Sequence, residues 1–423
     1  MKKIILFLIV FTTVILTYRL FSFINKYAVN LLYDDQWWIA DMIIENKPFK
    51  ELFFYLYSEH RIGVGLIIMR TLAVLTYWNT RFENFGFGIS VIIIALFSLA
   101  LKYKLAKKFE VTDIAIPIII INLHHHENLL EGFRVMYLIP VIIMYIYFWL
   151  FNLKFGWKYI AILILVILST FSGFHGIFLN LFVFLFEILK FIKAKNLKSK
   201  IANVIVLITV ILITSSYFIG FSSDHSDFTI PTLYYFYETP TRMINQIFGT
   251  TLRFPFNLIS PLIILGALII FITQFIKKRN LNLFPIFCLY FYSILFIITI
   301  IFGRNKFGPE VASSSRYVSH IVFLYLASYL TLILFLNKKL KKILFITIGI
   351  PILYFILFNN KSSYEVGNYY KNNKNAWIKC YLKKKNVHDC NDFFIFDKKH
   401  SNYLQTKVDQ LEKKKWSFFA EIQ

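Results

Sequence analysis

The sequence predicts an all-α integral membrane protein with about eleven transmembrane helices. Of its 423 residues 58% are hydrophobic, and the mean hydropathy is +0.61. Apolar runs long enough to span a bilayer recur along most of the chain, separated by short lysine-rich stretches, which is typical of polytopic helical membrane proteins. A membrane β-barrel would show alternating segments of about ten residues instead.

The net charge of +23 indicates a membrane partner rather than a nucleic acid. Many of the lysines lie in short loops between apolar runs, where they set topology and attract anionic lipid. We therefore expect contact with membrane lipid and no nucleic-acid partner.

The amino-terminal segment reads as an uncleaved signal anchor. Lys2 and Lys3 precede an apolar run that continues to Phe23. This run is longer than the core of a cleavable signal, and no small-residue cleavage site follows it. We expect the amino terminus to be cytoplasmic.

Placing every basic run in the cytoplasm fixes the expected crossings. The stretch 159–190 is too long for one span and breaks at 172–176, which predicts a hairpin of two short helices. Residues 62–80 contain Arg70 and are flanked by Arg61 and Arg81, so we expect an amphipathic helix on the outer membrane face. The other expected spans are 4–24, 86–101, 111–123, 135–152, 201–221, 257–276, 285–302, 317–336 and 342–358.

This topology divides the chain into a polytopic domain, 1–358, and an outward-facing polar tail, 359–423. The first outer loop covers 25–85. The other outer segments are 124–134, 172–176, 222–256 and 303–316. All would lie on one side of the membrane, which predicts one composite site at the outer face.

The first outer loop holds the strongest candidate for catalysis, a pair of aspartates. Asp34 and Asp35 are followed by Trp37 and Trp38. A hydroxyl that attacks a sugar carbon needs a carboxylate to take its proton, and tryptophan rings stack on sugars. The alternative is an interfacial cap in which the aspartates begin a short helix.

A second cluster in this loop is Glu59-His60-Arg61. The fork of donors on arginine matches two phosphate oxygens, so Arg61 is a candidate for phosphate binding, with Glu59 and His60 lining the substrate. The alternative is a local salt bridge at the start of the amphipathic helix.

Three histidines at 124–126 precede Glu127, but we expect no metal site there. Consecutive helical residues point in different directions, whereas metal sites favour spacings of three or four. We expect polar residues of this region and of the hairpin tip to line the substrate site instead. They are Glu127, Asn128, Arg134 and His175.

Cationic residues gather again between the spans at 285–302 and 317–336. Arg304, Lys306 and Arg316 concentrate donors at the depth of a lipid phosphate, and we expect Tyr317, which follows them, to line the substrate site. If the arginines only anchored the helices, the positive-inside rule would place them on the other face.

Two further segments carry weaker signals. The loop 222–256 mixes aromatic and charged residues, which suits a sugar-binding groove or an aromatic belt equally; the residues are Asp224, His225, Asp227, Tyr234, Tyr235, Tyr237, Glu238, Arg242 and Arg253.

Cys380 and Cys390 can form a disulfide if the tail faces an oxidising compartment. Cys288 lies in an apolar run and is expected to be an inert thiol.

The layout and these motifs resemble the GT-C superfamily of lipid-linked-sugar glycosyltransferases, and in particular serotype-converting O-antigen glucosyltransferases of phage or genomic-island origin. The resemblance implies that Asp34 is the first-loop acidic base, with Asp35 as the alternative. Some relatives have an aspartate–glutamate pair where this chain has two aspartates, so either carboxylate can be the base. By the same resemblance, Arg304 and Arg316 would hold the donor phosphate.

The resemblance implies an inverting hexosyltransferase of the bacterial inner membrane that needs no cofactor or metal. It would move a sugar, expected to be glucose, from polyprenyl phosphate to a lipid-linked or O-antigen saccharide, with a donor synthase and a flippase in the same pathway. The alternatives are an O-antigen polymerase and a lipid-linked-sugar flippase or transporter. Transporters place ionisable groups at mid-membrane, and the expected spans are nearly free of charge.

Overall fold

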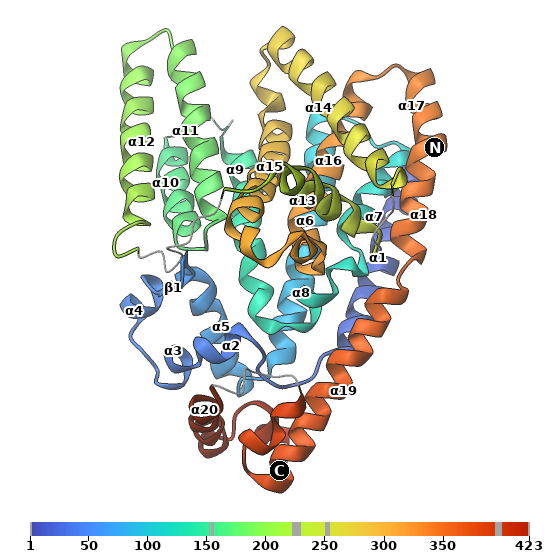
Figure 1. Ribbon diagram of the computed structural model, residues 1–423. Coiled ribbons are helices and arrows are strands. Elements are labelled where there is room, and N and C mark those ends of the chain that lie inside the picture. Colours follow the sequence, from blue (N-terminus) through green and yellow to red (C-terminus); the bar gives the residue numbers. More distant parts are fainter. Residues whose placement is uncertain are drawn as a thin grey trace. The chain divides into compact units, whose positions relative to one another are not determined.

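The protein is a multi-pass α-helical membrane protein. The computed structural model describes residues 2–151, 153, 156–221, 230–249, 254–393 and 400–421 (Figure 1). Within these ranges, eight helical segments are long and apolar enough to cross a membrane. They are Lys2–Tyr27, Thr80–Ala106, Gly132–Leu150, Leu197–Ser216, Phe256–Lys278, Leu281–Gly303, Ser315–Phe335 and Lys338–Lys384.

The remaining expected spans are shorter helices, so a total of eleven crossings stays a prediction. The expected hairpin at 159–190 consists of α10 (Trp157–Thr170) and α11 (Gly176–Lys193), and the chain turns between them where the break was predicted. The expected span at 111–123 is divided, with α7 (Ala115–Ile120) as its only α-helical part. Residues 62–80, which were expected to form an amphipathic helix, contain the apolar helix α5 (Gly63–Thr76).

Contacts divide the chain into two compact units, each built from three separate stretches. Unit 1 contains Met1–Leu20, Val91–His126 and His225–Ser363, and unit 2 contains Phe21–Ser90, Glu127–Asp224 and Tyr364–Gln423.

Unit 1 is a bundle of helices around α16 (Val318–Phe335), which is strongly apolar. Its main helices are α7, α13 (Leu233–Asn245), α14 (Ile259–Lys278), α15 (Phe284–Gly303), α17 (Lys338–Leu344) and α18 (Ile350–Phe358). The Tyr290 hydroxyl on α15 donates to Ser328 and Thr331 of α16, at 3.3 and 3.2 Å between oxygens. Such internal pairing is required in lipid, where no water satisfies a polar group.

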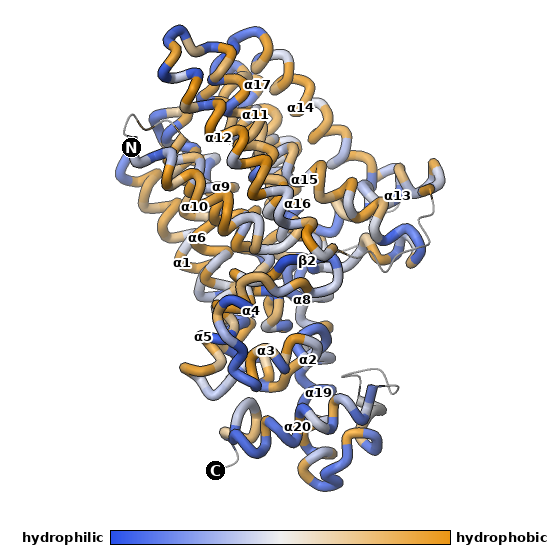
Figure 2. Tube along the Cα trace, turned by 90° about the vertical axis from the view of Figure 1, so that its left-hand side faces the viewer, coloured by the Kyte–Doolittle hydropathy of each residue, from blue (hydrophilic) through white to orange (hydrophobic). Residues whose placement is uncertain are grey.

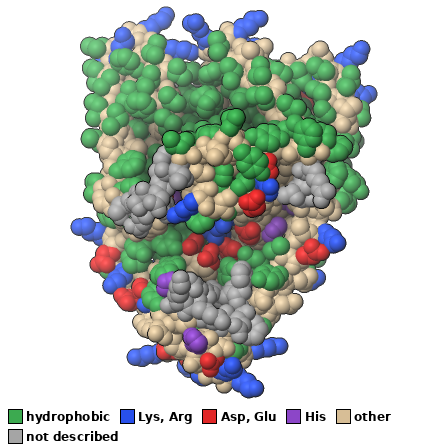
Figure 3. Space-filling view, in the orientation of Figure 1, with side chains coloured by type: hydrophobic (Ala, Val, Ile, Leu, Met, Phe, Trp, Pro, Cys, Tyr) green, Lys and Arg blue, Asp and Glu red, His purple; other side chains and the backbone are tan. Residues whose placement is uncertain are grey.

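Hydropathy differs between the helices of the bundle and those of the tail. The tubes of α14, α15 and α16 are hydrophobic along most of their length, whereas α19 (Lys361–Lys384) and α20 (Ser401–Lys414) are largely hydrophilic (Figure 2). In the space-filling view, hydrophobic side chains form a broad area, and Lys and Arg side chains lie along its upper edge (Figure 3).

Unit 2 includes a three-helix group of α10, α11 and α12 (Leu197–Ser216), of which α12 is long and apolar enough to cross a membrane. Asn180 Nδ2 on α11 donates to Thr170 of α10 and Thr214 of α12, at 2.7 and 3.0 Å. Four of the described helices have residues in both units. They are α1 (Lys2–Tyr27), α6 (Thr80–Ala106), α8 (His126–Leu130) and α19. The helix α9 (Ile139–Leu150) belongs to unit 2.

The first loop of unit 2 folds into short elements. These are α2 (Asp35–Trp38), α3 (Ala40–Ile44), α4 (Phe49–Phe53) and a small antiparallel hairpin of β1 (Leu56–Tyr57) and β2 (His60–Arg61), followed by α5. In the hairpin, Leu56 pairs with Arg61 and Tyr57 with His60.

The tail is helical and shares a hydrophobic core with the first loop. Trp377 of α19, Leu404 of α20 and Phe418 are buried in one cluster with Trp37 and Trp78. The cluster explains how so short a tail becomes ordered, because the first loop supplies the apolar surface that the tail lacks.

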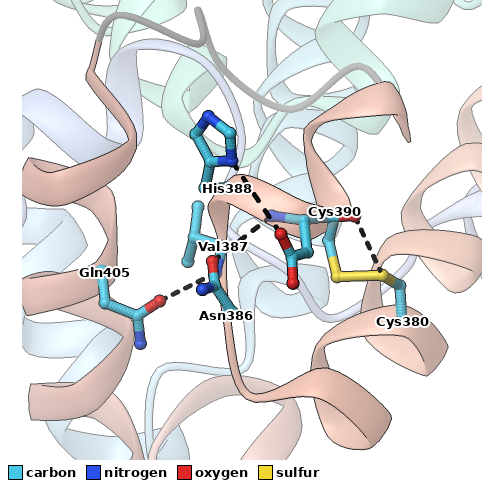
Figure 4. Close-up of a disulfide and its surroundings, with 7 residues drawn as sticks. Cys380, Asn386, Val387, His388, Cys390 and Gln405 are labelled. Carbon is cyan, nitrogen blue, oxygen red and sulfur yellow. Dashed lines mark hydrogen bonds and ion pairs between the residues drawn. A yellow bond between two sulfur atoms is a disulfide. The ribbon is translucent and has the colours of Figure 1, made fainter.

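A disulfide joins Cys380 of α19 to Cys390, with the Cα atoms 5.7 Å apart (Figure 4). Beside it, the backbone N–H of Val387 donates to Gln405 Oε1 at 2.8 Å, which ties this turn to α20. Closing so small a loop is worth about 2–3 kcal/mol in the chain-entropy model.

A membrane-impermeant maleimide tests the disulfide and the side of the tail together. In cells with a permeabilised outer membrane, we expect labelling of Cys380 only after reduction, because Cys390 is buried and both sulfurs are bonded. The Cys380→Ser/Cys390→Ser variant should stay unlabelled in both conditions. Labelling without reductant would contradict the disulfide, and no labelling after reduction would place the tail in the cytoplasm.

Candidate functional site

The predicted aspartate pair lies against a buried arginine in unit 2. Arg134 is 2% exposed, and its terminal nitrogens lie 3.4 Å from Asp34 Oδ2 and 3.4 Å from Asp35 Oδ2. Its Nε donates to Glu131 at 2.7 Å. The Asp34 and Asp35 side chains remain 52% and 28% exposed, so one buried cation supports two carboxylates that solvent can reach.

The backbone at Asp34 is strained. Asp34 has φ 50° and ψ −123°, in the positive-φ region that side chains other than glycine rarely adopt. Such strain persists only where the surroundings hold it, and it clusters at functional sites. The strain turns the chain sharply just before α2 begins at Asp35.

A buried polar relay holds this turn. Gln36 accepts a hydrogen bond from the backbone N–H of Tyr33 at 2.9 Å and donates to Glu83 at 2.6 Å. Glu83 also accepts from Trp78 Nε1 at 2.9 Å. A Cβ at position 132 would lie 2.3 Å from Glu83 Oε2, so glycine lets the backbone approach the relay.

Tail residues complete the surroundings of Arg134. The Tyr370 hydroxyl donates to Glu131 Oε1 at 2.8 Å, and Lys374 donates to the Leu130 carbonyl at 3.1 Å. The Lys374 ammonium also lies 4.8 Å from the centre of the Tyr33 ring. Tyr370 thus occupies one carboxylate oxygen of Glu131, and Arg134 Nε binds the other. The terminal nitrogens of Arg134 face the two aspartates.

Two tyrosines lie beside the aspartates. Tyr57 donates to Asp35 Oδ1 at 2.9 Å, and burial together with the Asp35 charge raises the Tyr57 pKa, so this phenol stays protonated. Tyr137 accepts from Arg134. The ring of His175 lies 6.4 Å from that of Tyr137, and burial lowers the His175 pKa, which keeps its imidazole neutral.

The structure separates the two tryptophans that were predicted to line the site. Trp37 is fully buried in the hydrophobic core, which corrects its assignment as a substrate-lining residue. Trp38 is 39% exposed. Its ring stacks on Tyr403 at 5.3 Å and meets the edge of His400 at 5.1 Å.

This aromatic group, which we call the Trp38 platform (Trp38, His400 and Tyr403), is fastened to the first loop. The Tyr403 hydroxyl donates to the Trp37 carbonyl at 3.2 Å and to Asp41 at 3.3 Å. Because Asp35 and Trp38 are three positions apart on α2, they share a face one helical turn apart. The platform therefore begins about 5 Å along the helix from the aspartates.

The Arg61 side chain forms its hydrogen bonds mainly with backbone carbonyls. Its side chain is buried and donates to the carbonyls of Phe54, Tyr217 and Ile219. These contacts fasten the β-hairpin and favour a structural role over the predicted phosphate role. The neighbouring Glu59 carbonyl accepts from the Tyr217 hydroxyl at 2.6 Å, and His60 lies 6.5 Å from the Phe174 ring.

The histidine run is buried in unit 1, and two of its three rings are hydrogen-bonded. His125 pairs with Ser319 and with the Ile120 carbonyl, each at 3.0 Å, and burial lowers its pKa to about 4. His126 pairs with Ser363 at 3.1 Å. In unit 2, Asn128 is completely buried and Glu127 partly so, which argues against a lining role for Asn128.

The cationic segment after α15 belongs to unit 1. Arg304 and Lys306 are exposed and flank the Phe307 ring, at 5.7 and 5.3 Å from its centre. Arg316 is partly buried and lies 5.6 Å from the ring centre of Tyr317, which is itself buried. Of the loop 222–256, Asp224, His225, Asp227 and Arg253 lie outside the described residues, whereas Arg242 donates to Glu238 at 2.7 Å.

Comparison with family models, curated proteins and solved structures finds no match to this chain.

Several members of the site escaped sequence reasoning. Glu131, Tyr57, Tyr370 and Lys374 carry no motif, and only their position in the fold reveals them. Glu83 had a usable signal, since it is an acidic residue near the start of an otherwise apolar span, where ionisable groups are costly.

Replacing Arg134 should destabilise the protein more than replacing any exposed arginine. Arg134→Met would leave three carboxylates around a buried neutral group, at a cost of about 3–5 kcal/mol. Thermal unfolding of the purified protein in detergent measures the change. Arg304→Met, at an exposed position, is the matched control and should shift the unfolding temperature little. Equal shifts in the two variants would contradict the role assigned to Arg134.

Proposed function

We propose that this chain is a membrane glycosyltransferase of the GT-C type. It transfers a sugar, glucose by our assignment, from polyprenyl phosphate to a lipid-linked or O-antigen saccharide. The observation that carries the proposal is the solvent-accessible Asp34–Asp35 pair, which a buried arginine and a strained turn hold in an otherwise apolar protein. Ionisable groups kept in such surroundings against their cost are typical of functional sites.

Asp34 is the proposed base, because it is the more exposed of the two carboxylates. It accepts the proton of an acceptor hydroxyl while the hydroxyl oxygen bonds to the anomeric carbon. The bond from that carbon to the phosphate oxygen breaks, and the phosphate leaves with the electron pair. A single displacement of this kind inverts the anomeric configuration.

Asp35 and Arg134 are proposed to position the base. Asp35 is less exposed and accepts from Tyr57, so its oxygens are already engaged. Arg134 lies 2.7 Å from Glu131 but 3.4 Å from each aspartate, so its contacts with the aspartates are the weaker ones. Asp34 is therefore able to accept a proton.

The donor phosphate is assigned to Arg304, Lys306 and Arg316. This assignment rests on the sequence and is supported by the exposure of the first two. Guanidinium and ammonium groups stabilise the charge that develops on a leaving phosphate, so the mechanism needs no metal. We place the reaction at the outer face of a bacterial inner membrane, with the amino terminus in the cytoplasm and the tail in the periplasm.

Asparagine substitutions test the base. Asp34→Asn should lower sugar transfer by about 100-fold or more, because general base catalysis contributes that much, and Asp35→Asn should lower it less. The assay follows radiolabelled glucose from polyprenyl phosphate to purified polysaccharide in membrane vesicles. Glu51→Gln, an exposed carboxylate of the same loop, is the control. Undiminished transfer by Asp34→Asn/Asp35→Asn at normal membrane abundance would refute the mechanism.

The Trp38 platform is proposed to bind the acceptor saccharide. Trp38→Ala should raise the acceptor KM by about tenfold, which corresponds to the loss of one aromatic stacking contact of about 1.4 kcal/mol. The donor KM should not change. Phe49→Ala, an exposed aromatic of the same loop, should leave both constants unchanged. A rise in donor KM alone would assign Trp38 to the donor.

A further inference from the structure

Unit 1 contains an apolar cavity of about 310 Å³, and none of the residues assigned to catalysis lines it. It lies among α14, α16, α7 and the α17–α18 segment, and its size falls in the range of small-ligand sites. Ile263, Gly266, Ala267, Leu332, Phe345 and Gly349 are among the residues that line it.

One wall of the cavity departs from α-helical geometry. Residues Phe345–Gly349, between α17 and α18, form a π-helix, and Phe345, Ile348 and Gly349 of this segment line the cavity. π-Helical turns are rare and frequent at functional sites. On α14, Gly266 also lines the cavity, and a Cβ added there would meet no atom within 4 Å, so the absence of a side chain leaves the space open.

The rim of the cavity is cationic. Lys341 lines the cavity, and Lys338, Lys339 and Lys342 share the short helix α17 with it. The nearby carboxylates are already neutralised, because Asp113 pairs with the buried Lys102 and Glu110 pairs with Lys108 at 2.6 Å. Tyr329 and Thr112, which also line the cavity, add hydroxyl groups at the Asp113 side.

We propose that this cavity binds one acyl chain of an anionic phospholipid, with the lipid phosphate at Lys341. An apolar cavity within membrane-spanning helices suits a hydrocarbon chain, and a lysine at its edge can reach a headgroup. The positive-inside rule assigns the α17 lysines to the cytoplasmic face, where anionic phospholipids supply that charge. The polyprenyl-phosphate donor is instead assigned to the outer-face residues, so the occupant is a structural lipid.

Native mass spectrometry of the full-length protein tests the site. The protein is released from detergent after incubation with palmitoyl-oleoyl phosphatidylglycerol or with the zwitterionic phosphatidylcholine of the same chains. We expect one phosphatidylglycerol to stay bound at collision energies that remove all phosphatidylcholine. Equal retention of the two lipids would overturn the role of charge.

Paired variants locate the lipid. Gly266→Phe places a ring in the open space of the cavity and should lower phosphatidylglycerol retention at least fivefold, whereas Leu265→Phe, an exposed neighbour on α14, should not. Lys341→Gln should lower retention and Lys339→Gln, at an exposed position outside the cavity, should not. Unchanged retention in both Gly266→Phe and Lys341→Gln refutes the site, and displacement of the lipid by undecaprenyl phosphate would make the carrier its occupant instead.

Discussion

The burial of Arg134 is the constraint on which the proposed site depends. A guanidinium that is withdrawn from water must be matched by anions and acceptors, or it would cost several kcal/mol. Glu131 supplies the closest match, and Tyr137 takes one further donor. The two aspartates complete the balance at longer distance. Glu131 thus does most of the work of neutralising Arg134. The two aspartates bind the guanidinium more loosely and can therefore lie at the solvent boundary.

Much of the fold could be predicted from the sequence, since apolar runs and their breaks report helix length directly. The division of α10 from α11 follows from local pattern, because the apolar stretch breaks at 172–176. The burial of Trp37 does not, because α2 has only one turn and no periodicity from which to choose a face. The relay of Gln36 and Glu83 was also beyond sequence reasoning, since it depends on the close approach of Gly132, about a hundred positions along the chain from the aspartates.

Among the described residues, some charged groups are held in internal contacts and others face solvent. Arg61 donates to three backbone carbonyls and so stabilises the β-hairpin. Its two-residue strands are too short to be stable alone. Lys102 and Asp113, both almost completely buried, form an ion pair in unit 1, and the Tyr329 hydroxyl donates to Asp113. Neither set presents a charge to solvent. By contrast, Asp34, Arg304 and Lys306 all do, which is the property that a group must have to meet a substrate.

The shared core of the first loop and the tail has a consequence for biosynthesis. Residues near Trp37 and Trp78 emerge from the ribosome hundreds of residues before Trp377 and Phe418, which complete their cluster. The first loop must therefore persist with an uncovered apolar surface until the tail has been synthesised, and chaperones or lipid headgroups can shield that surface in the meantime. A nonsense mutation late in the gene would remove little of the membrane region, yet it would leave that surface permanently open to aggregation and proteolysis.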